Sequence, residues 1–385
     1  MIVTQLSPEF IRGAVELEQT TRGVRPHRLP EVVRAQFPDP QLLLVESQPS
    51  GVRVVFETHA ERVELELQST RSVYTGIERP RGRVDVFVDG ERAASDELTG
   101  GDAVEVNLQT GAMSQHEGAS HTTIVGNLRP RVTKRVEFWL PHNESVELVA
   151  LRSDAPLEPV AASAPVWLHH GSSISHGSNA TAPSAIWPAV AARSAGVELV
   201  NLGLGGSAMV DPFLARVMRD TPADFISVKL GINVVNADAM RLRAFVPAVN
   251  GFLDTIRDGH PATPIVLISP IFCAIHEHTA GPGAFDPASF ATGQVRFIAT
   301  GTPGDEAQGR LTLSVIRREL AALAERRASD PNLHYLQGTE LYGEADAARL
   351  PLRDALHPGP EAHQLIGERF AAYAFVQGGP FDAAR

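Results

Sequence analysis

Cysteine is almost absent from this sequence. Cys273 is the only one in 385 residues, so no intrachain disulfide can form and no set of paired cysteines can hold a structural zinc ion. The N-terminal segment lacks the basic start and apolar run of a signal peptide, and no later stretch is long enough to span a membrane. We therefore expect a cytoplasmic protein with no membrane partner.

Basic residues are also fewer than acidic ones. The 34 Lys and Arg against 45 Asp and Glu give a formal net charge of -11, which leaves no positive excess to neutralise the phosphates of nucleic acid. Nucleic acid is therefore not an expected partner. Hydrophobic residues make up 43% and charged residues 21%, as in ordinary globular chains. A chain of 385 residues exceeds what one hydrophobic core usually holds, so two domains are predicted.

Apolar and polar residues alternate with period two between about residue 40 and residue 151. The runs 63–67 and 84–88 are examples, and Asp89-Gly90 after the second run offers the positive φ angles of a tight hairpin. A further pair of runs, joined by a short connection, is 136–140 and 146–149. This pattern predicts an antiparallel β-sandwich.

Residues 154–165 are rich in Pro, Ala and Ser, which is typical of a connection between domains. We place the boundary there, with a β-sandwich over 1–160 and a second domain over 161–385. In the second domain apolar runs alternate with helical patterns, which predicts a parallel sheet in a three-layer α/β/α domain. The expected strands are 165–170, 198–202, 225–230, 264–270 and 333–337, and the expected helices are 184–195, 240–257, 306–327 and 360–374.

The segment from Ile271 to Gly304 is unusually long for a connection and is rich in Gly, Pro, Thr and Phe. It is either a lid over a site or a surface excursion without function, because long loops can be either. Both interpretations stay open at the level of the sequence.

Serine follows the first expected strand of the second domain. Gly171-Ser172-Ser173 comes directly after the run 165–170, and the carboxyl edge of an open α/β sheet is where ligands bind. A hydroxyl in this turn would face the crevice at that edge. Ser173 is therefore a candidate nucleophile, although Gly-Ser-Ser also occurs in ordinary turns.

Glycines follow the second expected strand, at 203–206. One interpretation is a dinucleotide-binding G-x-G-x-x-A, but this strand is the second of its domain and no acidic residue closes the next one. The favoured interpretation is that the backbone N–H of Gly206 donates to a developing oxyanion. Asn233, at the end of the third expected strand, can supply a side-chain N–H for the same purpose or can simply cap a turn.

Asp354 and His357 precede the helical pattern 360–374. A carboxylate that accepts from one ring nitrogen fixes the tautomer and leaves the other nitrogen to take a proton from a serine hydroxyl. The alternative is a surface carboxylate–imidazole pair that precedes a helix beginning with proline.

Histidines gather at His169, His170 and His176, and again at His276 and His278. The last two would point to opposite sides of an extended segment, and no H-E-x-x-H spacing occurs nearby. We therefore predict no metal site. A pocket-lining role for the 276–278 pair stays open beside that of solvated loop residues.

Four segments resemble, in order, the motif blocks of the SGNH/GDSL hydrolase superfamily, over about residues 165–374. Gly171-Ser172-Ser173 resembles the first block, Asn201–Gly206 the second, Gly231-Ile232-Asn233 the third and Asp354–Pro358 the fifth. Two positions differ from the family pattern. Ser172 stands where an Asp usually precedes the nucleophile, and Val234 stands where an Asp usually follows the third-block Asn.

The resemblance implies a flavodoxin-like α/β/α catalytic domain preceded by a jelly-roll-like antiparallel β-sandwich. It implies Ser173 as nucleophile, His357 as base and Asp354 as the partner of the base, with oxyanion N–H groups from Ser173, Gly206 and Asn233. Neither a metal nor another cofactor is required. The expected partners are a small-molecule acyl donor and a hydroxylated acceptor.

Several functions fit this set of residues. The first interpretation is an ester or thioester hydrolase that works through an acyl-serine. The alternatives are an acyltransferase that moves an acyl group, for example from acyl-CoA, to a hydroxyl of a natural product such as a polyketide, and a carbohydrate O-acetyl esterase. A protein that keeps the fold only to bind is disfavoured, because the full set of five site residues would have no reason to coexist in it.

Overall fold

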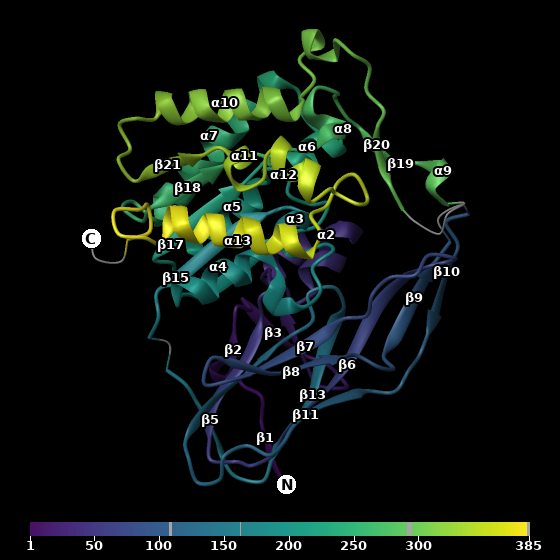
Figure 1. The fold of residues 1–385 in the computed structure, drawn as a ribbon, viewed down its shortest axis with the longest axis vertical. Helices are drawn as coiled ribbons and strands as arrows, with labels where there is room; N and C mark the ends of the chain where they lie inside the picture. The colour runs from purple at the N-terminus through teal and green to yellow at the C-terminus, as the bar shows by residue number, and fades with distance from the viewer. Residues whose placement is uncertain (108–109, 162, 291–294, 383–385) are drawn as a thin grey trace. The chain divides into compact units, whose positions relative to one another are not determined.

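The computed structural model describes residues 1–107, 110–161, 163–290 and 295–382 (Figure 1). The chain forms two compact units. The first unit comprises Met1–Ser163 with Thr181–Ser184, and the second comprises Ala164–Ala180 with Ala185–Arg385. Among the described residues, no helix combines the length and the apolar character needed to cross a membrane.

The first unit is built from two β-sheets. One runs in the order β10-β9-β6-β13-β4-β3, with β1 paired to β13 and β11 to β6, and the other runs β14-β5-β12-β7-β8, with β2 paired to β5. Its strands are β1 (Ile2–Thr4), β2 (Ile11–Arg12), β3 (Glu16–Gln19), β4 (Val24–His27), β5 (Arg53–Thr58), β6 (Val63–Tyr74), β7 (Arg83–Val88), β8 (Glu91–Glu97), β9 (Asp102–Val106), β10 (Met113–His116), β11 (His121–Val125), β12 (Lys134–Trp139), β13 (Ser145–Ser153) and β14 (Leu157–Pro159). Two short helices, α1 (Glu31–Gln36) and α2 (Pro40–Glu46), lie between β4 and β5 in the chain.

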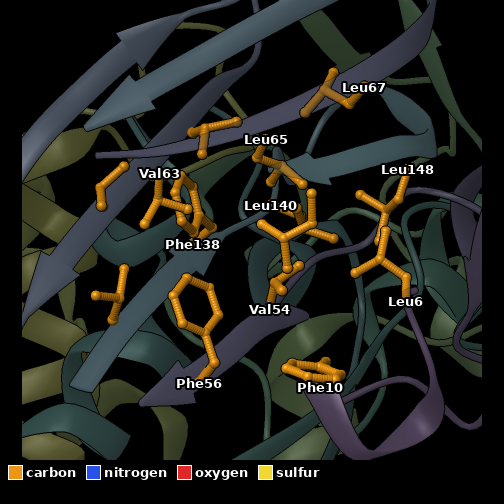
Figure 2. Close-up of a cluster of buried hydrophobic side chains, with 14 of the residues drawn as sticks. Leu6, Phe10, Val54, Phe56, Val63, Leu65, Leu67, Phe138, Leu140 and Leu148 are labelled. Carbon is orange, nitrogen blue, oxygen red and sulfur yellow. The ribbon is translucent and has the colours of Figure 1, made fainter. Parts of the chain in front are cut away.

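The core of the first unit lies between the two sheets. Alternate residues of β6, such as Leu65 and Leu67, are fully buried with Val54, Phe56 and Phe138 of the opposite sheet (Figure 2). Burial of one face of each sheet accounts for the period-two pattern of the sequence. The expected β-sandwich is therefore confirmed.

The strand pairing differs from the sequence-based expectation at one place. The sequence predicts no particular pairing for β12 and β13, which a short connection joins, and they lie in different sheets. The expectation of purely antiparallel pairing is wrong at β9, which pairs in parallel with β6, with Thr70 opposite Asp102. A strand that arrives from the other sheet is not constrained by a hairpin, so it can pair in either direction. The expected turn at Asp89-Gly90 is confirmed, with φ angles of 51° and 85° between β7 and β8.

The second unit contains a five-stranded parallel sheet in the order β16-β15-β17-β18-β21. The strands are β15 (Val166–Gly171), β16 (Glu198–Gly203), β17 (Phe225–Lys229), β18 (Ile265–Ile268) and β21 (Leu333–Leu336), at the positions of the five apolar runs. The second strand of the unit lies outside the first, which gives the doubly wound order of flavodoxin-like folds. The strand order reverses beside β15, so a ligand crevice is expected at the carboxyl ends of the strands there.

Helices cover both faces of this sheet. Trp167 of β15 packs on Trp187 of α4 and Phe370 of α13, whereas His170 of the same strand stacks on Phe252 of α7. Because successive strand residues point to opposite faces, α4 and α13 lie on one side of the sheet and α7 on the other (Figure 1). The helices are α3 (Ser173–His176), α4 (Trp187–Ala195), α5 (Pro212–Asp220), α6 (Ile232–Asn236), α7 (Leu242–Gly259), α8 (Ala274–Glu277), α9 (Pro287–Phe290), α10 (Leu313–Arg326), α11 (Gly338–Leu341), α12 (Glu344–Arg349) and α13 (Pro360–Ala374). The three-layer architecture is confirmed.

The long segment after β18 carries secondary structure of its own. Besides α8 and α9 it contains β19 (Gly283–Phe285) and β20 (Phe297–Ala299), which form a two-stranded antiparallel sheet. Residues 291–294 of this segment lie outside the described residues. We refer to 271–304 as the excursion.

Candidate active site

Ser173 is the first residue of α3, and β15 ends two residues before it. The side-chain oxygen of Ser172 accepts a hydrogen bond from the backbone N–H of Ile174 at 3.3 Å, so Ser172 caps α3. The second strand supports the same helix, because the side-chain amide of Asn201 in β16 donates to the backbone oxygen of Ser175 at 3.0 Å. Helix α3 therefore starts at the carboxyl edge of the sheet, with the hydroxyl of Ser173 at its first position.

Ser173 meets two side chains from a turn 181 and 184 residues further along the chain, those of Asp354 and His357. Oγ of Ser173 lies 2.9 Å from Nε2 of His357, and Nδ1 of His357 lies 2.7 Å from Oδ2 of Asp354. An ionised carboxylate can only accept, so Nδ1 carries a proton and Nε2 is left as the acceptor for the serine hydroxyl. The side chains of His357 and Asp354 are 12% and 18% exposed, which leaves the pair mostly shielded from water.

Asp354 is held ionised by several hydrogen bonds. Its Oδ1 accepts from the backbone N–H groups of Leu356 and His357 at 3.0 and 2.7 Å, and its Oδ2 also accepts from the side-chain amide of Asn179 at 3.1 Å. Burial alone would raise the pKa of this carboxyl group, but the hydrogen bonds and charge of His357 together with the backbone N–H groups outweigh it and lower the pKa to about 2. The carboxylate is therefore negative at neutral pH.

The excursion contacts the turn that carries Asp354 and His357. The backbone N–H of Phe297 donates to the backbone oxygen of Asp354 at 2.8 Å, and the thiol of Cys273 donates to the backbone oxygen of Ala355 at 3.3 Å. Ala355 has a φ of 69°, in the left-handed region that non-glycine residues seldom adopt. Hydrogen bonds from two points of the excursion therefore hold a strained turn in place.

Three hydrogen-bond donors lie at the ends of adjacent strands. Among the described residues, no group accepts from the backbone N–H of Ser173 after β15, or from that of the exposed Gly206 after β16. Oδ1 of Asn233, after β17, accepts from the backbone N–H of Ala208 at 3.1 Å. That bond fixes the orientation of the amide and leaves its NH2 group as a donor. The three donors are thus free to bind a negatively charged oxygen.

The histidines of β15 have structural partners. His169 contacts the hydroxyls of Ser227 and Ser175 at 2.7 and 2.8 Å, and His170 donates from Nδ1 to the backbone oxygen of Leu202 at 2.8 Å. Burial lowers the pKa of both rings, to about 4 for His170, so both are neutral at pH 7. Within the part of the chain that the structure describes, no three His, Cys, Asp or Glu side chains gather as a metal site would require.

Lys229, the last residue of β17, is almost completely buried. No carboxylate among the described residues forms an ion pair with it. Burial lowers the pKa of its ammonium group to about 8. Lys229 can therefore lose its proton in mildly alkaline solution without breaking an ion pair.

The two positions that depart from the SGNH/GDSL pattern have local explanations. Ser172 replaces the usual Asp as the cap of α3, since a serine oxygen can accept the same kind of backbone hydrogen bond. Val234 is fully buried in α6, where a carboxylate would lack water. Neither departure removes Ser173 from hydrogen-bond distance of His357.

Sequence reasoning did not identify Asn179 or Phe297. Asn179 lies in the loop after α3. Its hydrogen bond to Asp354 joins two residues that are far apart in the sequence and meet only in the folded chain. The rings of Phe297 and His357 are nearly perpendicular, with the centroids 5.5 Å apart. The richness of the excursion in Phe was the only sequence signal that pointed toward such a contact.

Comparison with known proteins adds to this geometry. Residues 165–277 match the GDSL-like lipase/acylhydrolase family, and residues 10–149 match the N-terminal domain of SsfX3. The second unit therefore carries a GDSL-like lipase/acylhydrolase domain, the first unit carries a domain like the N-terminal domain of SsfX3, and the protein is an enzyme of the esterase and acyltransferase class. A search among curated proteins found no match to the chain.

Several solved structures resemble the whole chain. The salicylyl-acyltransferase SsfX3 from a tetracycline biosynthetic pathway is 28% identical, and the match covers 96% of this chain and 95% of that one with a TM-score of 0.78. A Bacteroides ovatus protein assigned to the GDSL-like lipases is 17% identical over 94% and 93% of the two chains, with a TM-score of 0.63. A family two carbohydrate esterase from Clostridium thermocellum is 14% identical over 84% and 91%, with a TM-score of 0.53. The last two share the fold.

Proposed function

We propose that Ser173, His357 and Asp354 form a catalytic triad for acyl transfer. Oγ of Ser173 attacks the carbonyl carbon of an ester or thioester while its proton passes to Nε2 of His357. The carbonyl oxygen becomes negative and accepts from the N–H groups of Ser173, Gly206 and Asn233. The observation that supports this proposal is the continuous hydrogen-bonded series from Ser173 through His357 to Asp354.

The tetrahedral intermediate then collapses to an acyl-serine. The bond to the leaving alcohol or thiol breaks, and that group takes the proton from Nε2 of His357. A second nucleophile gives its proton to the same nitrogen and attacks the acyl carbon. When the bond to Oγ breaks, Ser173 takes the proton back, so the enzyme returns to its starting state. These steps need neither a metal nor another cofactor.

We infer that the second nucleophile is a hydroxyl of a small molecule, which makes the enzyme an O-acyltransferase. The likeness to SsfX3 supports this inference, since at 28% identity it extends over 96% of this chain, and residues 10–149 also match the N-terminal domain of that protein. The expected partners are a small-molecule acyl donor and a hydroxylated acceptor.

Hydrolysis is the second candidate. The family match over 165–277 is to lipases and acylhydrolases, and in a hydrolase water takes the place of the acceptor hydroxyl at the same acyl-serine. Removal of O-acetyl groups from carbohydrate is a special case of this reaction, and only the shared fold of carbohydrate esterases supports it.

The excursion supplies apolar surface next to the triad. The rings of Phe285 and Phe297 lie 5.1 Å apart between centroids, and Phe297 contacts His357. Phe285 is 40% exposed and lies opposite Phe297 in the two-stranded sheet, so the two rings are on the same face of it. Exposed aromatic surface at this place favours an acyl group with an apolar or aromatic body over an acetyl group.

Intact-protein mass spectrometry tests the proposal. The wild-type protein is mixed with a panel of activated esters and acyl-CoA thioesters, and the mass gain is followed after addition of alcohols. We expect an acyl adduct that is absent in Ser173→Ala and is discharged faster by an alcohol than by water. The matched control is Ser314→Ala, a serine of α10 outside the site, which should acylate like the wild type.

The outcomes separate the candidates. Discharge by water alone would make the protein a hydrolase. An adduct that persists in Ser173→Ala, or no adduct and no turnover with any donor, would contradict the triad assigned here.

A further inference from the structure

The first unit contains a cavity of about 290 Å³. It is lined by β6, by the loop between β6 and β7, and by the connection from β12 to β13. Every lining residue belongs to the first unit, and three of them are arginines, Arg71, Arg79 and Arg81. This volume is close to the roughly 300 Å³ of the smallest sites for small molecules, so only a small ligand fits.

Arg81 forms a rigid, neutral part of the wall. Its Nε and Nη2 donate to the two carboxylate oxygens of Glu144 at 2.8 and 3.1 Å, and the backbone N–H of Gly82 donates to the same carboxylate at 2.7 Å. Burial opposes ionisation of Glu144, but the hydrogen bonds from Arg81 and Gly82 outweigh it and lower the pKa of the carboxyl group. The charges of Arg81 and Glu144 neutralise each other, so this ion pair contributes no net charge to the cavity.

Arg71 is in a different situation. Val63, Leu65 and Leu67 of β6 are buried in the core of the sandwich (Figure 2), and Arg71 continues the same alternation on that strand. Its Nε is buried and has no hydrogen-bond partner. No described carboxylate forms an ion pair with it. The side chain as a whole is half-buried, and its buried Nε is a donor that the chain leaves without an acceptor, so a ligand oxygen in the cavity would complete its hydrogen bonding.

Arg79 and Asn143 complete the polar lining. The guanidinium of Arg79 lies 5.3 Å above the ring centre of Tyr74 and, among the described residues, has no acidic partner. Oδ1 of Asn143 is buried without a donor, although its NH2 group donates to the backbone oxygen of Pro80 at 3.3 Å. The cavity therefore presents two unneutralised guanidinium groups and one unused acceptor.

The net charge of the lining has the opposite sign to that of the chain. With Glu78 and Glu144 set against the three arginines, the lining carries one net positive charge, whereas the chain has a formal net charge of -11. Electrostatic attraction of an anion to this part of the protein is therefore local and does not follow from the overall charge.

We propose that this cavity is a binding site for a small molecule with a carboxylate or phosphate group. Arg71 and Arg79 donate to the oxyanion, because the guanidinium fork matches both groups. A hydroxyl of the same ligand donates to Oδ1 of Asn143. None of the residues of the proposed triad lines the cavity.

Isothermal titration of the full-length protein with pyrophosphate and with citrate tests the proposal, with sodium chloride added to keep the ionic strength constant. We expect saturable binding of at least one anion, at one site per chain. The affinity should fall about tenfold or more in Arg71→Gln and in Arg79→Ala, because each removes charge-assisted hydrogen bonds. Binding of only one of the two anions identifies the group as phosphate or carboxylate.

Arg92→Ala is the matched control, because Arg92 is an exposed arginine of β8 that does not line the cavity. It should bind like the wild type. Thermal unfolding without ligand checks that Arg71→Gln is folded, and Arg79→Ala, at an exposed position, serves as the second variant. Absence of saturable binding for both anions, or equal weakening by Arg92→Ala, would overturn the proposal.

Discussion

The side-chain oxygen of Asn233 accepts a hydrogen bond from the backbone N–H of Ala208, at 3.1 Å. Ala208 lies in the loop that also carries Gly206, so this bond links the segment after β17 to the loop after β16. Because the bond occupies the oxygen of the amide, its NH2 group remains available as a donor. An asparagine fixed in this way can stabilise an oxyanion without reorganising during the reaction.

Asn233→Ala removes one of the three proposed oxyanion donors. We expect kcat for an activated ester to fall by about 10² to 10³, with a much smaller change in KM, because the interaction is made in the transition state. Steady-state kinetics measures both constants. The control is Asn250→Ala on the α7 helix, whose side chain bonds to Val246 outside the site. An unchanged kcat in Asn233→Ala would show that its NH2 group does not contact the oxyanion.

Asp354→Asn tests the role of the carboxylate. An amide NH2 facing Nδ1 of His357 would stabilise the tautomer that carries its proton on Nε2, which cannot take the proton of Ser173. We expect kcat to fall by about 10⁴ while the fold is retained. Asp330→Asn, which changes a carboxylate paired with Arg257, is the control and should stay active. A loss of less than about tenfold would argue against the assigned tautomer.

The buried histidines predict an acid-sensitive fold. Burial lowers the pKa of His169, His170 and His363, to about 4 for the last two. The unfolded chain takes up these protons near pH 6.5 and the native protein does so only at lower pH, near 4 for His170 and His363, so the free energy of unfolding should fall as the pH drops through this range. Urea denaturation at several pH values measures it.

Two variants make this pH dependence specific. His170→Asn keeps a donor toward Leu202 but cannot titrate, so it should flatten the dependence between pH 6.5 and 4. His116→Asn, at a position exposed on β10, should leave it unchanged. A free energy of unfolding that stays constant from pH 7 to pH 4 would contradict the assignment of neutral buried rings.

Gly203→Ala should damage the site through the backbone. A Cβ at Gly203 would lie 2.4 Å from the backbone nitrogen of His176 in α3, so β16 and the helix that carries Ser173 would have to separate. We expect a loss of about 1–3 kcal/mol in the free energy of unfolding and a reduced kcat. Denaturation and steady-state kinetics measure the two effects.

The comparison for that variant is Gly251→Ala in α7, where nothing lies within 4 Å of the added atom. Alanine is the better helix former, so this variant should gain about 0.5–1 kcal/mol and keep full activity. Similar behaviour of the two variants would mean that α3 can move away from β16 without consequence.

Phe285→Ala and Phe297→Ala test the apolar surface beside His357. If these rings contact the acyl group, kcat/KM for donors with an aromatic or long acyl chain should fall about tenfold or more, while that for an acetyl donor changes less, because only the larger groups reach the rings. The control is Phe37→Ala, at an exposed position of the first unit. Leu333→Ala would not serve, because Leu333 belongs to β21 of the parallel sheet. Equal losses for acetyl and larger donors would point to a role in positioning His357 instead.

Much of the second unit could be predicted because its signals are local. Each strand of the parallel sheet lies at an apolar run of the sequence, and the motif residues Ser173, Gly206 and Asn233 come within four residues of the ends of three of these strands. The carboxyl ends of parallel strands share one edge, so strand order alone brings these residues to the same side of the sheet. No detailed geometry was needed for that inference.

What could not be predicted depends on contacts between distant segments. The bond from Asn179 to Asp354, and that from Phe297 to the same residue, join segments that no sequence period relates. The parallel pairing of β9 with β6 depends on the route of the chain between sheets. Helices α1 and α2 are only six and seven residues long, too short for a clear helical period.

The single cysteine provides a natural reporter of motion at this site. Cys273 is 1% exposed and donates to the backbone oxygen of Ala355, and burial raises the pKa of its thiol to about 12. Alkylation requires the thiolate and access to it, so the native protein should react only when this part of the excursion opens. The rate of alkylation then measures how often the turn carrying Asp354 and His357 loses that contact, with no label introduced into the chain.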